Sequence, residues 1–127
     1  MQKNLEELYV LIRDIDVVML TTRRFDGHLV ARPMETQAQH AECDLWLAAY
    51  DDAHLLEEVE RDPNVCLAYQ GDGDWISVSG TARVIYDGAG AAHVEITVDT
   101  AVRFVGRVTE VLFQRERVAA EEFHHFG

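Results

Sequence analysis

The chain has 127 residues, of which 48% are apolar, and a formal net charge of -12 at pH 7. This length supports one hydrophobic core and is too short for two ordinary domains, so we expect a single domain over residues 1–127. Lys3 is the only lysine among eleven basic residues. A chain without a basic stripe cannot neutralise a nucleic-acid backbone or an anionic membrane, so we expect neither as a partner.

The chain also lacks the signals of a secreted or membrane protein. The N-terminal stretch MQKNLEEL has no apolar segment of the kind found in signal peptides, and no apolar run approaches the length of a membrane span. Cys43 and Cys66 suit reduced thiols in or near the core better than a disulfide framework. These features predict a cytoplasmic protein.

The first half of the chain predicts a helix, a hairpin, a strand and a second helix. Leucine and isoleucine recur at helical spacing over residues 4–15, and Asn4 is placed to cap that helix. VVMLTT and HLVARPMETQ flank the turn RFDG, which predicts a hairpin over 17–38. The strand DLWLAAY follows. A short surface helix then begins at a cap supplied by Asp51 or Asp52 and stops at Pro63.

The second half predicts strands only. NVCLAYQ and WISVSGTARVIYD flank the turn GDGD as a second hairpin, and Gly80 inside the second strand indicates a bulge. DGAGAA at 87–92 predicts a loose connection, and the last two strands are HVEITVD and GRVTEVLFQRERV. The fold class is therefore mainly β with two short helices, and six to seven mostly antiparallel strands indicate a small barrel.

The stretch ARPMETQ at 31–37 is the leading candidate for a binding site. Proline cannot donate to a sheet ladder and holds the residue before it extended, so this stretch suits an edge strand or a bulge. Side chains alternate along a strand, so Arg32, Met34 and Thr36 share one face. A stiff arginine beside unpaired backbone suits an anionic ligand; the alternative is an arginine paired with one of the many acids.

The ordered series LTT, DG, ARPM, DLWL, DPNV and WISVSGTARVIYD resembles the flavin-binding split-barrel group that includes the pyridoxamine-phosphate oxidases, and in particular its branch of short general stress proteins. The similarity runs from about residue 5 to 87 without a gap, and the later strands resemble those that close the same fold. The resemblance implies a single FMN-binding split β-barrel, a homodimer with flavin at the subunit interface, and a redox role. The residues that it places at the flavin are Arg32, Pro33, Met34, Thr36, Ala49, Tyr50 and His54.

Three positions depart from that branch, which usually supplies threonine, serine and lysine to the flavin phosphate. An ungapped alignment puts Ala49, Ala53 and Leu55 at those positions. Each charge-assisted bond contributes about 1.5–3 kcal/mol, so their loss weakens FMN binding by several powers of ten. Two hypotheses remain: FMN binds through Arg32, backbone amides and His54, or the chain is a flavin-free dimeric module for a small ligand or an interaction. A pyridoxamine-phosphate oxidase is not expected, because few cations remain for a second phosphate.

Other residues favour structural roles. Trp46 and Trp75 are interpreted as core or interface anchors rather than ligand-stacking groups. His40, Cys43 and Cys66 would form a soft metal set only if the fold gathered them, and their spacing matches no known ligand pair, so no metal is predicted. His124 and His125 fit a frayed terminus better than a metal site. No residue is assigned a catalytic role, and enzyme activity stays open.

Overall fold

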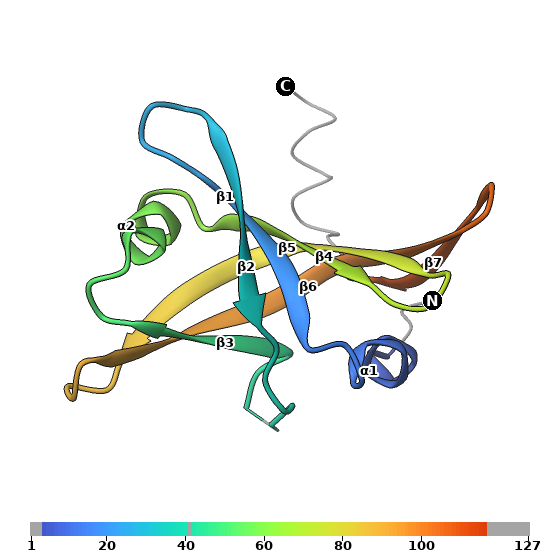
Figure 1. Cartoon of the computed structure of the whole chain (residues 1–127), viewed down its shortest axis with the longest axis horizontal. Coiled ribbons are helices and arrows are strands. Elements are labelled where there is room, and N and C mark those ends of the chain that lie inside the picture. The colour runs from blue at the N-terminus through green and yellow to red at the C-terminus, as the bar shows by residue number, and fades with distance from the viewer. Residues whose placement is uncertain (1–3, 41, 117–127) are drawn as a thin grey trace.

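The computed structural model describes residues 4–40 and 42–116, which form seven strands and two short helices (Figure 1). In chain order these are α1 (Glu6–Ile12), β1 (Val17–Arg23), β2 (Leu29–Glu35), β3 (Leu45–Tyr50), α2 (His54–Arg61), β4 (Asn64–Gln70), β5 (Trp75–Tyr86), β6 (Ala91–Val105) and β7 (Val108–Gln114). The predicted mainly β class with two short helices is confirmed. His124 and His125 lie outside the described residues. No helix within the described ranges is long and apolar enough to cross a membrane.

All strands belong to one antiparallel sheet that curls into a split barrel. The strand order is β2-β1-β4-β5-β6-β3, and β7 pairs with β6. The long strand β6 pairs with β3 through residues 91–96 and with β7 through residues 100–105. Figure 1 shows β5 and β6 running across the whole molecule. The terminal strands β2 and β3 approach each other without being neighbours in the hydrogen-bonded order. We call this gap between β2 and β3 the seam.

Alternation along the strands decides which side chains enter the barrel. In β1, Val18, Leu20 and Thr22 are buried while their neighbours face outward. The same period of two recurs in β4 and β5, as expected for strands with one buried face. The barrel interior is therefore a continuous apolar core.

The two helices close the ends of this core (Figure 1). Leu8 and Ile12 of α1 are buried, as are Leu55, Leu56 and Val59 of α2. Helical spacing puts these residues on one face of each helix, so both helices add apolar side chains to the barrel rather than forming a second layer.

Most local predictions hold, but the helix caps, the length of β6 and one connection differ. The N-cap of α1 is Leu5 rather than Asn4, although Asn4 Oδ1 accepts a bond from the Glu6 N–H at 3.0 Å, and β6 extends over Ala91–Val105. The sheet register shifts between Ser79 and Gly80, which confirms the bulge. A Cβ atom on Gly80 would collide with the Thr97 carbonyl oxygen, so the bulge requires glycine. Neither Asp51 nor Asp52 caps α2, because both lie in the turn that ends β3; the N-cap is Ala53, without a side-chain bond.

The connection between β5 and β6 is also tighter than predicted. Asp87 accepts hydrogen bonds at Oδ1 from the backbone N–H groups of Ala89 and Ala91, at 2.8 and 3.2 Å. Tyr86 pairs directly with Ala92 across the hairpin. The segment 87–90 is therefore a closed turn rather than a loose connection.

Candidate functional site

The strand that carries Arg32 forms one border of the seam. β2 is the first strand of the sheet and pairs with β1 alone, which confirms that the proline-containing strand is an edge strand. Arg32 and Met34 are half-buried on the barrel side, whereas Ala31 and Pro33 are exposed on the other side. Strand alternation therefore directs Arg32 to the barrel side of β2, where it contacts α2.

Arg32 meets a buried carboxylate there. Its guanidinium donates to Glu58 Oε1 and to Thr22 Oγ1, each at 3.0 Å, and Thr22 donates to the same Glu58 oxygen at 2.6 Å. Glu58 is 8% exposed and Thr22 is 1% exposed. The reading in which Arg32 pairs with an acid is thus correct, but the pair is largely buried rather than on the open surface.

The electrostatics of this cluster keep Glu58 ionised. Burial raises the pKa of Glu58, but hydrogen bonds from Thr22 and Arg32 and the charge of Arg32 outweigh it, so the pKa is lowered overall. A buried carboxylate with a guanidinium partner holds that guanidinium in one place. Arg32 is therefore fixed in position, and part of its charge is already balanced.

A cavity of about 340 Å³ opens beside this cluster, and we call it the arginine cavity. Four basic side chains line it, and two acids, Glu57 and Glu58, share it; the full lining is Arg24, Phe25, Val30, Arg32, His54, Glu57, Glu58 and Arg61. The Arg61 guanidinium lies over the Phe25 ring, 5.8 Å from its centroid. Three guanidinium groups around one cavity are suited to an anion such as a phosphate.

The residues predicted to surround a flavin do not all meet in this cavity. Arg32 and His54 line it together. Thr36 lines a different cavity and donates to the Ile15 carbonyl oxygen at 2.6 Å, a bond that anchors the end of β2. Met34 packs against the core. Pro33 is exposed on the opposite face of β2.

The two predicted residues of β3 lie on the other border of the seam. Ala49 is half-buried against the core, whereas Tyr50, at the end of the strand, is 78% exposed. An exposed tyrosine ring at a seam offers a flat surface to a ligand or a second chain. β3 therefore contributes shape and an aromatic ring, but little charge.

Leu55, which the ungapped alignment puts at the position of the lost lysine, faces the core in this fold. Leu55 is 6% exposed and belongs to the core cluster. A lysine there would bury its ammonium among apolar side chains instead of reaching a ligand. The exposed position at the start of α2 is His54, one residue earlier, because a shift of one residue on a helix moves a side chain from the buried face to the open one.

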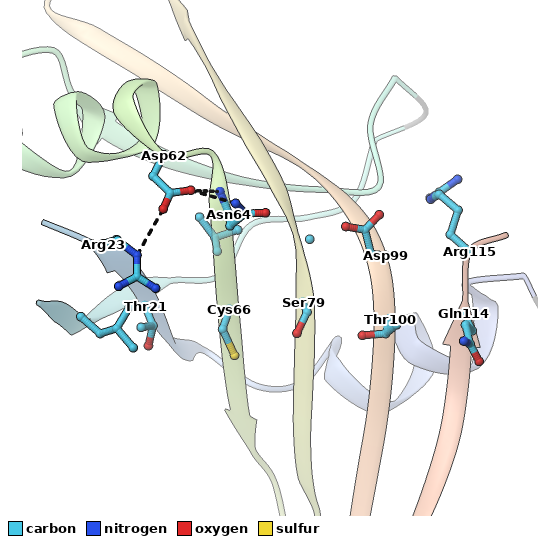
Figure 2. A pocket seen from close by; sticks show the side chains of 13 residues that line it. Thr21, Arg23, Asp62, Asn64, Cys66, Ser79, Asp99, Thr100, Gln114 and Arg115 are labelled. Carbon is cyan, nitrogen blue, oxygen red and sulfur yellow. Dashed lines mark hydrogen bonds and ion pairs between the residues drawn. The ribbon is translucent and has the colours of Figure 1, made fainter. Parts of the chain in front are cut away.

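Sequence reasoning missed a second cavity, of about 550 Å³, on the outer side of the sheet (Figure 2). Its floor is a straight row of polar side chains, one from each of five neighbouring strands and each paired with the next in register: Thr21, Cys66, Ser79, Thr100 and Gln114. We call this the polar row. Alternation identifies outward residues in each strand, but only the register shows that these five align.

The possible metal ligands divide between two places. The structure brings His40 and Cys43 together, with His40 Nε2 3.5 Å from Cys43 Sγ. Cys66 belongs to the polar row, where its sulfur lies 3.5 Å from Ser77 Oγ. Both cysteines are half-buried free thiols, as predicted, but Cys66 lies on the outer side of the sheet rather than in the core.

Comparisons with known proteins agree with this fold. A protein related to general stress protein 26 from Clostridium acetobutylicum is 14% identical, with a TM-score of 0.71 over 86% of this chain and 93% of that one. General stress protein 26 from Bacillus anthracis is 19% identical, with a TM-score of 0.69 over 84% and 97%. A pyridoxamine 5'-phosphate oxidase-related, FMN-binding protein from Nostoc punctiforme is 7% identical, with a TM-score of 0.65 over 74% and 77%. At these identities the three structures establish a shared fold.

The family comes from the sequence itself. No curated protein matches the sequence. The family described as pyridoxamine 5'-phosphate oxidase like matches residues 3–94, which include both borders of the seam and the arginine cavity. Because this match covers well over half of the chain, the protein belongs to the pyridoxamine 5'-phosphate oxidase-like family.

Proposed function

We propose that the protein is a homodimeric flavin-nucleotide-binding protein with a redox role, and that FMN binds at the seam with its phosphate in the arginine cavity. The observation that carries this proposal is the convergence of Arg24, Arg32, Arg61 and His54 on one cavity between α2 and the β1-β2 hairpin. Family membership and the FMN-binding protein among similar structures support the choice of ligand.

The arginine cavity offers a phosphate other positive groups in place of the three side-chain donors missing at Ala49, Ala53 and Leu55. Arg61 contacts the Phe25 ring, and Arg24 pairs with Asp26 at 3.3 Å at an exposed site, where an ion pair contributes little. Both guanidinium groups can therefore turn to an incoming dianion. Glu57 and Glu58 oppose such a ligand, so we expect weaker binding than a cavity lined by cations alone would give.

The protein residues would position the ligand rather than react. A bound flavin supplies electron or hydride transfer. Arg61 and His54 would hold the phosphate, Arg32 is fixed by Glu58 and would orient the chain next to it, and Tyr50 would shield one side of the seam. No proton transfer is assigned to any side chain of the protein.

A second copy of the chain would cover the outward face of the sheet. The outward face of the sheet carries exposed apolar side chains beside the polar row, among them Met19, Trp75, Phe104 and Val111. Trp75 pairs directly with Phe104 across β5 and β6, so two of these side chains are adjacent. Burial of such a face contributes about 25 cal/mol for each Å² removed from water, which favours association. We propose that this face forms the dimer interface.

Flavin titration tests the proposal. The purified protein is titrated with FMN, FAD and riboflavin, and binding is followed by quenching of flavin fluorescence. Arg61→Ala should weaken FMN about tenfold, since one charge-assisted bond contributes about 1.5 kcal/mol or more, and should leave riboflavin unchanged because it has no phosphate. Arg107→Ala, at an exposed turn distant from the cavity lining, is the matched control. Absence of binding to FMN, FAD and riboflavin would overturn the flavin proposal.

The second candidate is a flavin-free dimeric module for another small ligand or an interaction. Its specific support is that Glu58 already balances Arg32, while Ala49 and Ala53 offer no side-chain donor. A colourless protein that elutes as a dimer and ignores all three flavins would favour this candidate. A yellow protein, or saturable FMN quenching, would favour the flavin role.

A further inference from the structure

A cluster of three possible metal ligands lies where the segment that joins β2 to β3 meets β6, distant in the fold from the arginine cavity. His40 and Cys43 belong to this segment, and Glu95 belongs to β6. Their ligand atoms, one nitrogen, one sulfur and one carboxylate oxygen, all lie within 4.8 Å of one another, and all three residues are half-buried. Sequence spacing missed the set because Glu95 lies some fifty positions after the other two.

The fold explains why these residues meet. Trp46 of β3 pairs in register with Glu95 of β6. The Trp46 indole donates to the Ala38 carbonyl oxygen at 2.7 Å, and its ring lies 5.6 Å from the His40 ring. This indole therefore holds the connecting segment against the side of the sheet on which Glu95 lies.

The charges around the three residues suit a cation. The negative charges of Glu95, Asp44 and Glu42 act on the Cys43 thiol, and the positive charge of Arg83 opposes them. The same negative field attracts a divalent cation, which in turn stabilises a thiolate.

One basic residue competes with such a cation. Arg83 donates from Nε and from one terminal nitrogen to a single oxygen of Glu95, Oε1, at 3.3 and 3.0 Å. Its side chain is 75% exposed, so it can swing into solvent at little cost. The Glu42 backbone N–H also contacts His40 Nδ1 at a long 3.3 Å. Coordination of an ion through Nε2 would put the ring proton on Nδ1. Nδ1 could then no longer accept from the Glu42 N–H, so this weak bond would be lost.

We propose that His40, Cys43 and Glu95 form a Zn²⁺ site with three protein ligands and a fourth position open to water. Imidazole nitrogen, thiolate and carboxylate are the ligands that zinc takes in proteins, and a three-ligand site leaves one tetrahedral position free. Because the connecting segment joins the two strands that border the seam, a bound ion would tie this connection to β6 and hold the seam at a fixed width.

The site is tested with Co²⁺ as a spectroscopic probe and Zn²⁺ as the competing ion, using the full chain. Binding through Cys43 should give a thiolate-to-cobalt charge-transfer band that saturates at one ion per chain and disappears when Zn²⁺ is added. Cys43→Ser should abolish the band. Cys66→Ser, which removes the other half-buried thiol, should keep it. A band that follows Cys66, or no band at all, would overturn the proposal.

Two further variants separate this site from Zn²⁺ binding elsewhere on the chain. Arg83→Met should tighten Zn²⁺, measured against a chromogenic chelator, by about tenfold because it removes the competing cation, whereas Glu95→Gln should weaken it by at least a similar factor. The adjacent histidines at 124 and 125 are replaced by alanine in a parallel titration. Unchanged affinity in that variant supports the site, and loss of all Zn²⁺ binding there overturns it.

Discussion

Replacing Arg32 by methionine should destabilise the protein, because it leaves the Glu58 carboxylate buried without its cationic partner. The bond from Thr22 at 2.6 Å remains, while the 3.0 Å bond from Arg32 and its charge are lost. Removing one partner of a buried ion pair lowers the free energy of unfolding by about 3–5 kcal/mol. The Arg32 side chain is 24% exposed and that of Glu58 is 11% exposed, so water screens part of the interaction. We expect the free energy of unfolding to fall by about 2–3 kcal/mol at pH 7.

The loss should depend on pH in a direction set by Glu58. In the wild type the pKa of folded Glu58 is below its ordinary value of 4.5, so its stabilising contribution is present above pH 4.5 and disappears as pH falls through the folded pKa. Without Arg32, burial should raise the folded pKa above that ordinary value. The variant then regains stability as its Glu58 becomes protonated, so the gap from wild type should narrow between pH 7 and pH 4.5.

A double-mutant cycle measures this interaction. The free energy of unfolding is determined by urea denaturation for the wild type, Arg32→Met, Glu58→Met and the double variant. Two apolar side chains in place of the pair should recover most of the lost stability, because no buried charge then lacks a partner. Three results would each refute the role given to this pair: a loss below about 1 kcal/mol for Arg32→Met at pH 7, a gap from wild type that stays constant with pH, or a double variant no more stable than Arg32→Met.

Three other substitutions test the fold and the sites. Leu55→Lys should lower the melting temperature without tightening FMN, because it buries a charge in the core, whereas His54→Lys at the exposed position should tighten FMN at low salt; the opposite ranking by flavin titration would contradict the site. Gly80→Ala should lower the free energy of unfolding by about 1–3 kcal/mol in urea denaturation, because the added Cβ collides with the Thr97 carbonyl oxygen. An unchanged stability would show that β6 can move aside to make room for the Cβ. Phe104→Glu should convert a dimer into a monomer in light scattering, since it puts charge into an apolar face; an unchanged dimer would place the interface elsewhere.

The sequence predicted local features well because each depends on neighbouring residues. Pro33 marked an edge strand, and alternation put Arg32 and Met34 on one face. The partner of Arg32 was beyond such reasoning, because Glu58 lies 26 positions away and resembles many other acids in an acidic chain. The sequence also did not show which of two helical neighbours faces the core: Leu55 is buried, whereas His54 is exposed.

The polar row and the possible metal ligands could not be predicted either, because their members lie far apart in the sequence. The polar row needs the register of five strands, and a shift of one residue in any strand would turn its member to the other face. The set of His40, Cys43 and Glu95 depends on the pairing of β3 with β6. Sequence patterns fix the period within a strand, whereas these sites are fixed by the alignment between strands.

The position of β3 has a consequence for how the chain folds. Most strand pairs are consecutive hairpins that close over short turns, but β3 pairs only with β6, whose residues begin about forty positions later. Loop-closure entropy must be overcome before such a pair gains its contacts, and high contact order slows folding toward the range of about milliseconds to seconds. β3 should therefore join the sheet late, after the β4-β5-β6-β7 meander has formed, and so should the β1-β2 hairpin, because β1 pairs with β4 over a similar separation.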